Sequence, residues 1–371
     1  MIRLNVPFTD GDELIELESV LKTGYLTQGP KTEEFESGVR ELLGCQNAVA
    51  TSSATTALHL VLEGVGIGAG DEVLVSDFTY PASANVIIQT GAKPVCVDVL
   101  PDTYAMNPQD MQSRVTDKTK AVIVVHPFGL SADMDSIKDI AGKHNLFVLE
   151  DAACALGSKY KDNYCGTMGD AGCFSFHPRK SITTGEGGMM ITDSEELAAR
   201  CVILRGHGGV RQEYYCRFEK AGFNYKISDI SAAVGVAQLR KLRRIIEGRR
   251  DRAHKLGKML EGVDCIALPC EPDECYHTFQ SFVIVLDGDI GRDKIIHGMR
   301  QRGVETTLGT YALHSQPFFN EKYKFQPGEL PVSHRIFCNS LALPISFNMT
   351  DEELETVSKS LKECLRDGVH S

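Results

Sequence analysis

The sequence predicts an α/β protein with a large α/β/α domain around a mainly parallel sheet and a small α+β domain at the C-terminal end. Short apolar runs alternate with helical stretches from about residue 47. These runs are continuously apolar, as expected for strands that helices cover on both faces. The 371 residues, 42% of them hydrophobic, suffice for one large core and a smaller one.

The apolar runs define the order of the large domain. The expected strands are 47–51, 72–76, 94–99, 120–126, 146–151, 172–177 and 188–192. In parallel sheets of this kind, ligands bind at the carboxyl ends of the strands. We therefore look for functional residues in the turns that follow these runs.

The pattern changes after residue 226. Apolar residues from Ile227 to Ala237 recur at spacings of 3, 4 and 3 and predict a long helix. The helix continues into a basic run at 240–252. We interpret this run as a solvated helix face that links two domains, with phosphate binding as the alternative.

The last third of the chain contains a β-like run at 279–286 and a helical run at 292–303. A final helix is expected after 350–353, where Thr and Glu have capping-box spacing. We expect a large domain at 1–248 and a small domain at 249–371.

Composition argues against several classes of partner. The formal net charge of -11 disfavours nucleic acid and anionic membranes, because both attract clustered Lys and Arg. Residues 1–20 lack the apolar core of a signal peptide, and no later stretch reaches the ~18 apolar residues of a membrane span. The cysteines are scattered, and no CxxC or HExxH motif occurs. We expect a cytoplasmic protein with reduced thiols and without a metal site.

The segment 51–60 has small hydroxyl residues where an apolar strand ends and a helix begins. The first amides of a helix are unpaired and its N-terminus is partially positive, so Ser52–Thr55 can bind a phosphate group. Ser and Thr are also common N-caps, which is the alternative explanation.

The strand at 146–149 ends in Glu150 and Asp151. A carboxylate at this position can lie beside the pyridine nitrogen of pyridoxal 5′-phosphate (PLP), where it keeps that nitrogen protonated. The alternative is that Asp151 caps the next helix.

The segment 174–190 runs from a strand into a Pro-containing turn that presents Lys180, and it returns through a Gly-rich stretch. A lysine that bonds to an aldehyde needs this exposure, in a partly desolvated and positively biased site that lowers its pKa. An ordinary surface lysine is the alternative.

The three elements are more specific together than alone. A phosphate site, an acidic residue about 95 residues later, and Lys180, 29 residues after Asp151, all fall at the mouth of one sheet. This is the order found in fold-type I PLP enzymes. We therefore predict the fold of a fold-type I PLP-dependent transferase.

The chain also resembles the DegT/StrS-type nucleotide-sugar aminotransferases from about residue 3 to about residue 360. The similar segments follow the family's order: GYLTQGPKTEEFE at 24–36, DFTYPASAN at 77–85, VHPFGLSADMDSI at 125–137, EDAACALG at 150–157, GDAGCFSFHPRK at 169–180, TTGEGGM at 183–189, GFNYKISDISAA at 222–233 and LPI at 343–345.

The resemblance implies roles around the cofactor ring. Lys180 is expected to form the covalent bond to PLP and to move the proton in both half reactions. Asp151 is expected to pair with the pyridinium nitrogen, and Tyr80 is expected to stack on the ring.

The resemblance also implies a phosphate site and a dimer. The amides of Ala54 and Thr55 and the side chain of Ser175 are expected to hold the phosphate. Asn224 is expected to reach the phosphate of the neighbouring subunit's cofactor, which implies a homodimer with shared active sites.

Two positions depart from the family's pattern. Ala54 stands where many members have Gly, but it still provides an amide. Cys154 stands where Gln or His often lies near the ring oxygen of the cofactor. Because Cys is a weak hydrogen-bonding group, that contact is in doubt.

Three residues are the expected substrate contacts. Tyr25 belongs to the family-like segment GYLTQGP. Tyr311 and His314 fall where the family's C-terminal domain closes over the sugar. For His314, a structural role in the loop is the alternative.

The activity implied by the resemblance is transamination. L-glutamate converts the cofactor to pyridoxamine phosphate and leaves as 2-oxoglutarate, and the amino group then passes to a nucleotide-linked 4-keto-6-deoxy sugar. HPRKSITTGEGG at 177–188 is similar to the lysine segment of enzymes that aminate C-4. The product would serve amino-sugar biosynthesis for a surface polysaccharide, another glycan or a secondary metabolite.

Other functions were weighed against this one. Amination at C-3 and a non-catalytic PLP- or sugar-binding regulatory protein are the alternatives. A related class that removes C-3 hydroxyls has His in place of the lysine, so Lys180 argues against it. A fold-type I enzyme acting on amino acids is disfavoured by the sugar-family segments.

Overall fold

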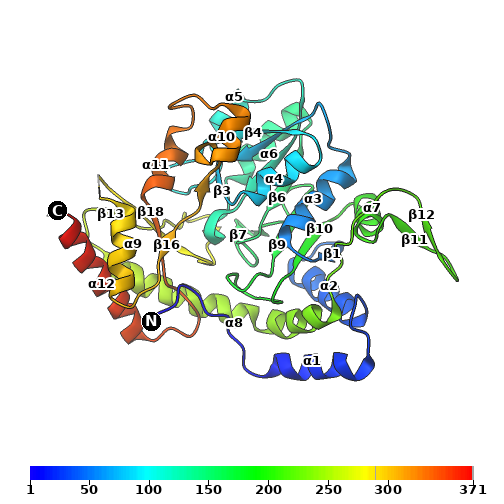
Figure 1. The fold of residues 1–371 in the computed structure, drawn as a ribbon, viewed down its shortest axis with the longest axis horizontal. Helices are drawn as coiled ribbons and strands as arrows, with labels where there is room; N and C mark the ends of the chain where they lie inside the picture. Colours follow the sequence, from blue (N-terminus) through cyan, green and yellow to red (C-terminus); the bar gives the residue numbers. More distant parts are fainter. Residues whose placement is uncertain (289, 370–371) are drawn as a thin grey trace.

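The computed structural model describes residues 1–288 and 290–369. Its centre is a seven-stranded sheet in the order β1-β10-β9-β6-β5-β2-β4 (Figure 1). The strands in this order are β1 (Asn47–Thr51), β10 (Gly188–Thr192), β9 (Ala171–Ser175), β6 (Phe147–Asp151), β5 (Thr119–Val125), β2 (Glu72–Ser76) and β4 (Lys93–Val97). Only β10 runs antiparallel to its neighbours. The predicted mainly parallel sheet is therefore confirmed.

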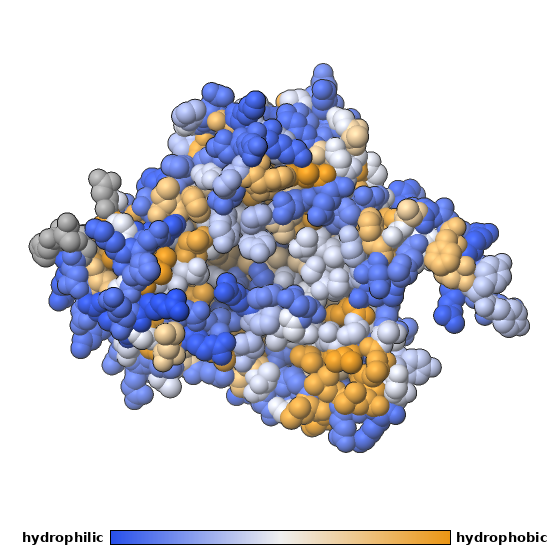
Figure 2. Space-filling model, in the orientation of Figure 1, coloured by the Kyte–Doolittle hydropathy of each residue, from blue (hydrophilic) through white to orange (hydrophobic). Residues whose placement is uncertain are grey.

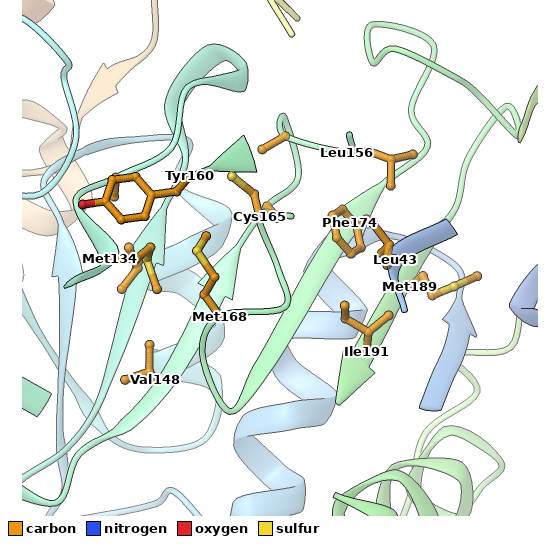
Figure 3. Close-up of a cluster of buried hydrophobic side chains, with 14 of the residues drawn as sticks. Leu43, Met134, Val148, Leu156, Tyr160, Cys165, Met168, Phe174, Met189 and Ile191 are labelled. Carbon is orange, nitrogen blue, oxygen red and sulfur yellow. The ribbon is translucent and has the colours of Figure 1, made fainter. Parts of the chain in front are cut away.

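Alternate residues of one strand enter separate cores, which explains the continuously apolar runs. In β5, Val122 and Val124 belong to one buried cluster, whereas Ala121 and Ile123 belong to another. The first cluster lies under α2 (Pro30–Leu43), α5 (Pro108–Ser113), α6 (Met134–His144) and α8 (Asp229–Leu260). The second lies under α3 (Ala54–Val65), α4 (Ala82–Gln89) and α7 (Glu195–Arg205). Figure 3 shows part of the first cluster, with Leu43 of α2 and Met189 of β10 among its members.

The C-terminal part has its own core. Its sheet has the order β13-β15-β18-β16, formed by β13 (Ile266–Ala267), β15 (Phe282–Leu286), β18 (Ser340–Leu343) and β16 (Thr307–Leu308). α9 (Arg292–Gln301) and α12 (Asp351–Val369) pack on it. Thr350 and Glu353 bond each other's backbone amides at 3.0 and 3.2 Å, so the predicted capping box is present.

The remaining elements are short, apart from the first helix. They are α1 (Asp12–Thr23), β3 (Phe78–Thr79), η1 (Pro127–Gly129), β7 (Lys159–Tyr160), β8 (Asn163–Tyr164), β11 (Gly209–Arg211), β12 (Cys216–Phe218), β14 (Cys275–Tyr276), β17 (Tyr311–Ala312), η2 (Leu313–Ser315), α10 (Pro317–Tyr323) and α11 (Pro331–Asn339). No helix in the described part of the chain is both long and apolar enough to cross a bilayer.

Helix α8 joins the two parts and begins with the N-cap Ser228. It runs without a break through the expected boundary between 248 and 249. The division into domains at that position stays a prediction.

The basic run of α8 is largely paired. Lys241 is only 7% exposed and bonds Glu13 at 2.8 Å, and Arg240 bonds Glu16 at 2.7 Å. The interpretation of this run as a solvated face is wrong for the buried Lys241 and Arg249, whereas Arg240, Arg243 and Arg244 are exposed. Its acidic partners lie more than 200 residues earlier in α1, so the local sequence pattern could not reveal them.

Helix α1 consequently has charged side chains on its inner face and apolar side chains on its outer face. Its acidic Glu13 and Glu16 face inward to α8, whereas Leu14, Ile15 and Leu21 are exposed. We call these three residues the α1 apolar face. Figure 2 shows an orange area at the bottom of the molecule, where Figure 1 places α1. The β11–β12 hairpin projects from the body in Figure 1.

Candidate active site

The candidate residues lie at the carboxyl edge of the central sheet. Ser175, the last residue of β9, pairs with Gly188, which in turn pairs with Thr51 at the end of β1. Asp151 is the last residue of the neighbouring strand β6. The structure thus brings the three predicted sequence elements to one edge.

The start of α3 has two free backbone amides. Ser53 caps the helix and accepts from the Thr56 amide at 3.1 Å, and Thr56 Oγ1 accepts from the Ser53 amide at 3.0 Å. The next two amides, those of Ala54 and Thr55, donate to no acceptor within the described residues. Free amides at a helix N-terminus fit a phosphate group.

Asp151 is a buried carboxylate without a cationic partner. It is 6% exposed, and its oxygens accept from Ser83 Oγ at 2.7 Å and from the Ala153 amide at 3.2 Å. Within residues 1–288 and 290–369, no Lys, Arg or His lies within ion-pair distance of it. A buried anion of this kind fits a protonated ring nitrogen, because the pair would neutralise both charges.

Lys180 lies at the same edge, on a turn closed by the hydrogen bond from its amide to His177 O at 2.8 Å. Its Nζ donates to Cys154 Sγ at 3.0 Å, and Cys154 follows Asp151 by three residues. The lysine forms no ion pair with any residue that the structure describes. The amine, the carboxylate and the free amides together fit PLP.

Tyr80 and Tyr311 bring the C-terminal part to this edge. Tyr80 is 67% exposed, although it follows the buried strand β3. β17 pairs with β3, and the rings of Tyr311 and Tyr80 meet edge to face with centroids 6.2 Å apart. An exposed aromatic ring beside the sheet edge can cover a flat ligand.

His314 is held within the protein. Its Nδ1 lies 2.6 Å from Oδ2 of the fully buried Asp77, and its Nε2 lies 3.1 Å from Ser315 Oγ. Its amide also bonds Asp77 Oδ1 at 2.9 Å. Both ring nitrogens therefore have partners, which favours the structural alternative for this residue.

Two candidates stand apart from the others. Tyr25 is exposed in the turn after α1 and forms no side-chain hydrogen bond with another candidate in the described chain. Asn224 is exposed as well, and Tyr225 beside it accepts at its carbonyl from the Ser52 amide at 2.8 Å. The Asn224 segment therefore runs alongside this chain's own predicted phosphate-binding turn at 52–55.

Sequence reasoning missed two supporting residues. Ser83 orients Asp151, and Asp77 holds His314. Both lie in DFTYPASAN, but only their contacts across the fold reveal these roles. A polar residue directly after a buried strand, as Asp77 is after β2, was the available signal.

Comparisons with known proteins agree with this geometry. The DegT/DnrJ/EryC1/StrS aminotransferase family model matches residues 7–362. GDP-perosamine synthase of Escherichia coli O157:H7 is 34% identical over 351 residues, 94% of each chain. The spore coat polysaccharide biosynthesis protein SpsC of Bacillus subtilis is 32% identical and covers 98% of this chain and 96% of its own length.

A solved structure shares the whole fold. The PMP form of Spr1654 from Streptococcus pneumoniae has a TM-score of 0.95 at 26% identity and covers 99% of this chain and 100% of its own. The resemblance found in the sequence is confirmed. Because the match covers nearly the whole chain, this protein belongs to the DegT/DnrJ/EryC1/StrS family of PLP-dependent sugar aminotransferases.

Proposed function

We propose that this protein transfers an amino group from L-glutamate to a nucleotide-linked keto-sugar, with Lys180 as its catalytic residue. One observation carries the proposal: a lysine without an ion pair, a buried carboxylate without a counter-ion and free helix amides, judged over residues 1–288 and 290–369, meet at one sheet edge. L-glutamate becomes 2-oxoglutarate in the first half of the reaction, and the keto-sugar receives the amino group in the second.

The cofactor contacts follow from the same edge. When bound, PLP accepts electron density from the substrate carbon and carries the amino group between the two half reactions. Asp151, oriented by Ser83, stabilises the protonated ring nitrogen. The amides at the start of α3 and the side chain of Ser175 bind the phosphate, and Tyr80 lies against the ring.

Lys180 is the proton-transfer group in this proposal. Among the described residues its Nζ hydrogen-bonds the weakly polar Cys154, so little binding energy opposes its movement to the substrate carbon. Two other histidines are engaged: His126, after β5, bonds Glu150 at 2.7 Å, and His314, after β17, bonds Asp77. A lysine held at the reacting carbon makes the proton transfer intramolecular.

The substrate is proposed to be a 4-keto-6-deoxy sugar that is aminated at C-4. The similarity of 177–188 to the lysine segment of C-4 enzymes supports this choice. GDP-perosamine synthase is a nucleotide-sugar enzyme by its name, and SpsC is named for polysaccharide biosynthesis. Amination at C-3 is the second candidate, because the same lysine and cofactor would serve it. Tyr25 and Tyr311 are the proposed sugar contacts, with His314 positioned behind them.

The active unit is proposed to be a homodimer in which Asn224 reaches the partner's cofactor. Two exposed features support a second copy: the α1 apolar face, and the projecting β11–β12 hairpin with its exposed Tyr214 and Phe218. Apolar surface of this kind gains stability when a partner covers it.

An absorption spectrum tests the first half reaction. The protein is loaded with PLP and its visible band is followed as L-glutamate is added. We expect bleaching in the native protein, and no lysine-bound band in Lys180→Ala. Lys118→Ala, an exposed lysine before β5, is the matched control and should behave like the native protein.

The second half reaction identifies the sugar. The aminated protein is mixed with GDP-, dTDP- and UDP-linked keto-sugars, and the position of the new amine is located by NMR. Return of the visible band with a C-4 amine supports the proposal. A C-3 amine selects the second candidate, and no visible band in the native protein after PLP addition would sink the enzymatic proposal.

A further inference from the structure

Two side chains from distant parts of the chain hold the turn that carries Lys180. Asn5 Nδ2 donates to Pro178 O at 2.9 Å, and Gln280 Nε2 donates to Arg179 O at 2.7 Å. These are the last two carbonyls before the lysine. One anchor comes from the N-terminal segment and the other from the segment before β15.

Arg249 of α8 links the two anchors. Its Nη1 donates to Asn5 Oδ1 at 2.8 Å, and its Nη2 donates to Gln280 O at 2.5 Å. Its Nε donates to Phe279 O at 3.2 Å. The guanidinium group thus hydrogen-bonds both residues that hold the turn. All of its acceptors are uncharged.

The burial of Arg249 is unusual for a charged side chain. It is 2% exposed and has no carboxylate within ion-pair distance in the described part of the chain. Burial lowers the pKa of Arg249 to about 10. Burying a charge without a counter-ion costs free energy. The presence of Arg249 at this position therefore points to a need for several N–H donors in one fixed plane.

The far end of the turn is fixed by the buried Ile182 and by Thr183, whose amide donates to Gln238 Oε1 at 3.3 Å, but residues 177–180 have few other hydrogen bonds. The Lys180 amide bonds His177 O, and the Arg179 amide bonds His177 Nδ1 at 3.1 Å. Both bonds are local, and neither fixes the turn relative to the sheet edge. Because Nζ lies at the end of a long side chain, a small rotation of the peptide before Lys180 moves the amine farther than it moves the backbone.

We infer that Asn5, Gln280 and Arg249 are positioning residues that aim Lys180 at the cofactor. The inference rests on the proposed role of Lys180. It adds three residues, none of which needs to contact the cofactor or the substrate. A cluster that merely joined the N-terminal segment to the body would affect stability and leave the reactivity of Lys180 unchanged.

The test uses four variants that separate these roles. Asn5→Asp keeps the acceptor for Arg249 and removes the donor to Pro178 O. Gln280→Ala removes the donor to Arg179 O and keeps the backbone acceptor for Arg249. Arg249→Lys replaces the planar group. Arg250→Lys is the matched control, because Arg250 bonds Glu271 and His277 O instead of this cluster.

The first readout is the rate at which PLP attaches to Lys180 in cofactor-free protein, trapped with borohydride and located by peptide mapping. The second is kcat against KM for L-glutamate, and the third is the thermal midpoint. Asn5→Asp and Gln280→Ala should slow attachment and lower kcat by about tenfold, with KM changed less than about twofold, because misplacement weakens catalysis more than binding. Both should melt close to the Arg250→Lys control.

The inference is overturned if Asn5→Asp and Gln280→Ala attach PLP at the control rate, whatever their melting points. Loss of folding in Arg249→Lys does not affect this test, because the other two variants keep Arg249. If the native protein attaches no PLP at Lys180, the proposed function fails first. If the native protein attaches it and all variants match it, only the positioning role fails.

Discussion

Two charged regions of this protein differ in how their charges are compensated. At the α1–α8 contact, Lys241 bonds Glu13 and Asp10, and Arg240 bonds Glu16. At the carboxyl edge of the sheet, Lys180 bonds a thiol, and Asp151 accepts from a hydroxyl and an amide.

The difference separates structure from function. Charges that meet their opposites inside the chain stabilise the fold, and a ligand would gain little by approaching them. Charges held in place by neutral groups remain available to a charged ligand. Neutral compensation together with a position at the carboxyl edge of the sheet marks Lys180 and Asp151 as the site, whereas Arg249, which also bonds neutral acceptors, is enclosed behind the turn.

The largest expected effect falls on the lysine at the sheet edge. Lys180→Ala should lower transamination by at least about 10⁴-fold, because a proton-transfer group is lost. Its free energy of unfolding should change by less than about 0.5 kcal/mol, since no ion pair is broken. Single-turnover spectra and urea unfolding measure the two quantities. A large loss of stability would show that Lys180 belongs with the charges that stabilise the fold.

The reverse result is expected at the α1–α8 contact. Lys241→Met should cost about 3 kcal/mol of stability, because the buried carboxylate of Glu13 and the more exposed carboxylate of Asp10 lose their partner. Transamination per folded molecule should stay near the native value. Urea unfolding and the spectral assay test this pair of outcomes, and equal stability in variant and native protein would contradict it.

The stability provided by the α1–α8 contact should also depend on pH. Burial raises the pKa of Glu13, but hydrogen bonds from Lys241 and Gln238 outweigh it and lower the pKa to about 2. The unfolded chain binds this proton near pH ~4.3, so the stabilisation is present above that pH and is lost as the pH falls towards 2, by about 3 kcal/mol. Unfolding at a series of pH values should show a loss of stability in acid, and Glu13→Gln should reduce it, while Glu16 and Glu72, whose pKa values are also lowered, maintain the remainder.

Removing the charge of Asp151 tests the other carboxylate. Asp151→Asn keeps the acceptor for Ser83 but cannot stabilise a protonated ring nitrogen. Transamination should fall by about 10²-fold, while PLP still attaches to Lys180. Stopped-flow spectra with L-glutamate measure the rate. An unchanged rate would mean that the carboxylate only caps the turn.

The smallest effect is expected at Cys154. Cys154→Ala removes one weak hydrogen bond to Lys180 and should change the rate by about threefold at most. The pH dependence of the visible band in native protein and variant is the measurement. A loss as large as that of Asp151→Asn would give the thiol a direct role in the reaction.

The strands and the edge that carries the site were predictable because they depend on local sequence. The run KAVIVVH predicted a doubly buried strand, and β5 is that strand. Likewise, Asp151 and Lys180 were predicted from their places after strands, and both lie at the expected edge.

Contacts between distant segments were not predictable in the same way. The basic run of α8 could not be distinguished from a solvated face, because Glu13 and Glu16 precede it by more than 200 residues. Ser83 was unrecognised as the partner of Asp151 for the same reason. His314 lies in a short motif that suggests a site. Its ring, however, is held by the distant Asp77, which the motif does not reveal.

The anchoring of the Lys180 turn has a consequence for the biogenesis of the enzyme. Asn5 precedes every strand of the central sheet in the chain and is synthesised before them, whereas Gln280 is synthesised after the whole sheet. The turn therefore reaches its final geometry only when the segments before and after the central sheet have folded together. Cofactor capture should be a late event during synthesis, and nascent chains that end before residue 280 should attach PLP slowly even with the sheet complete.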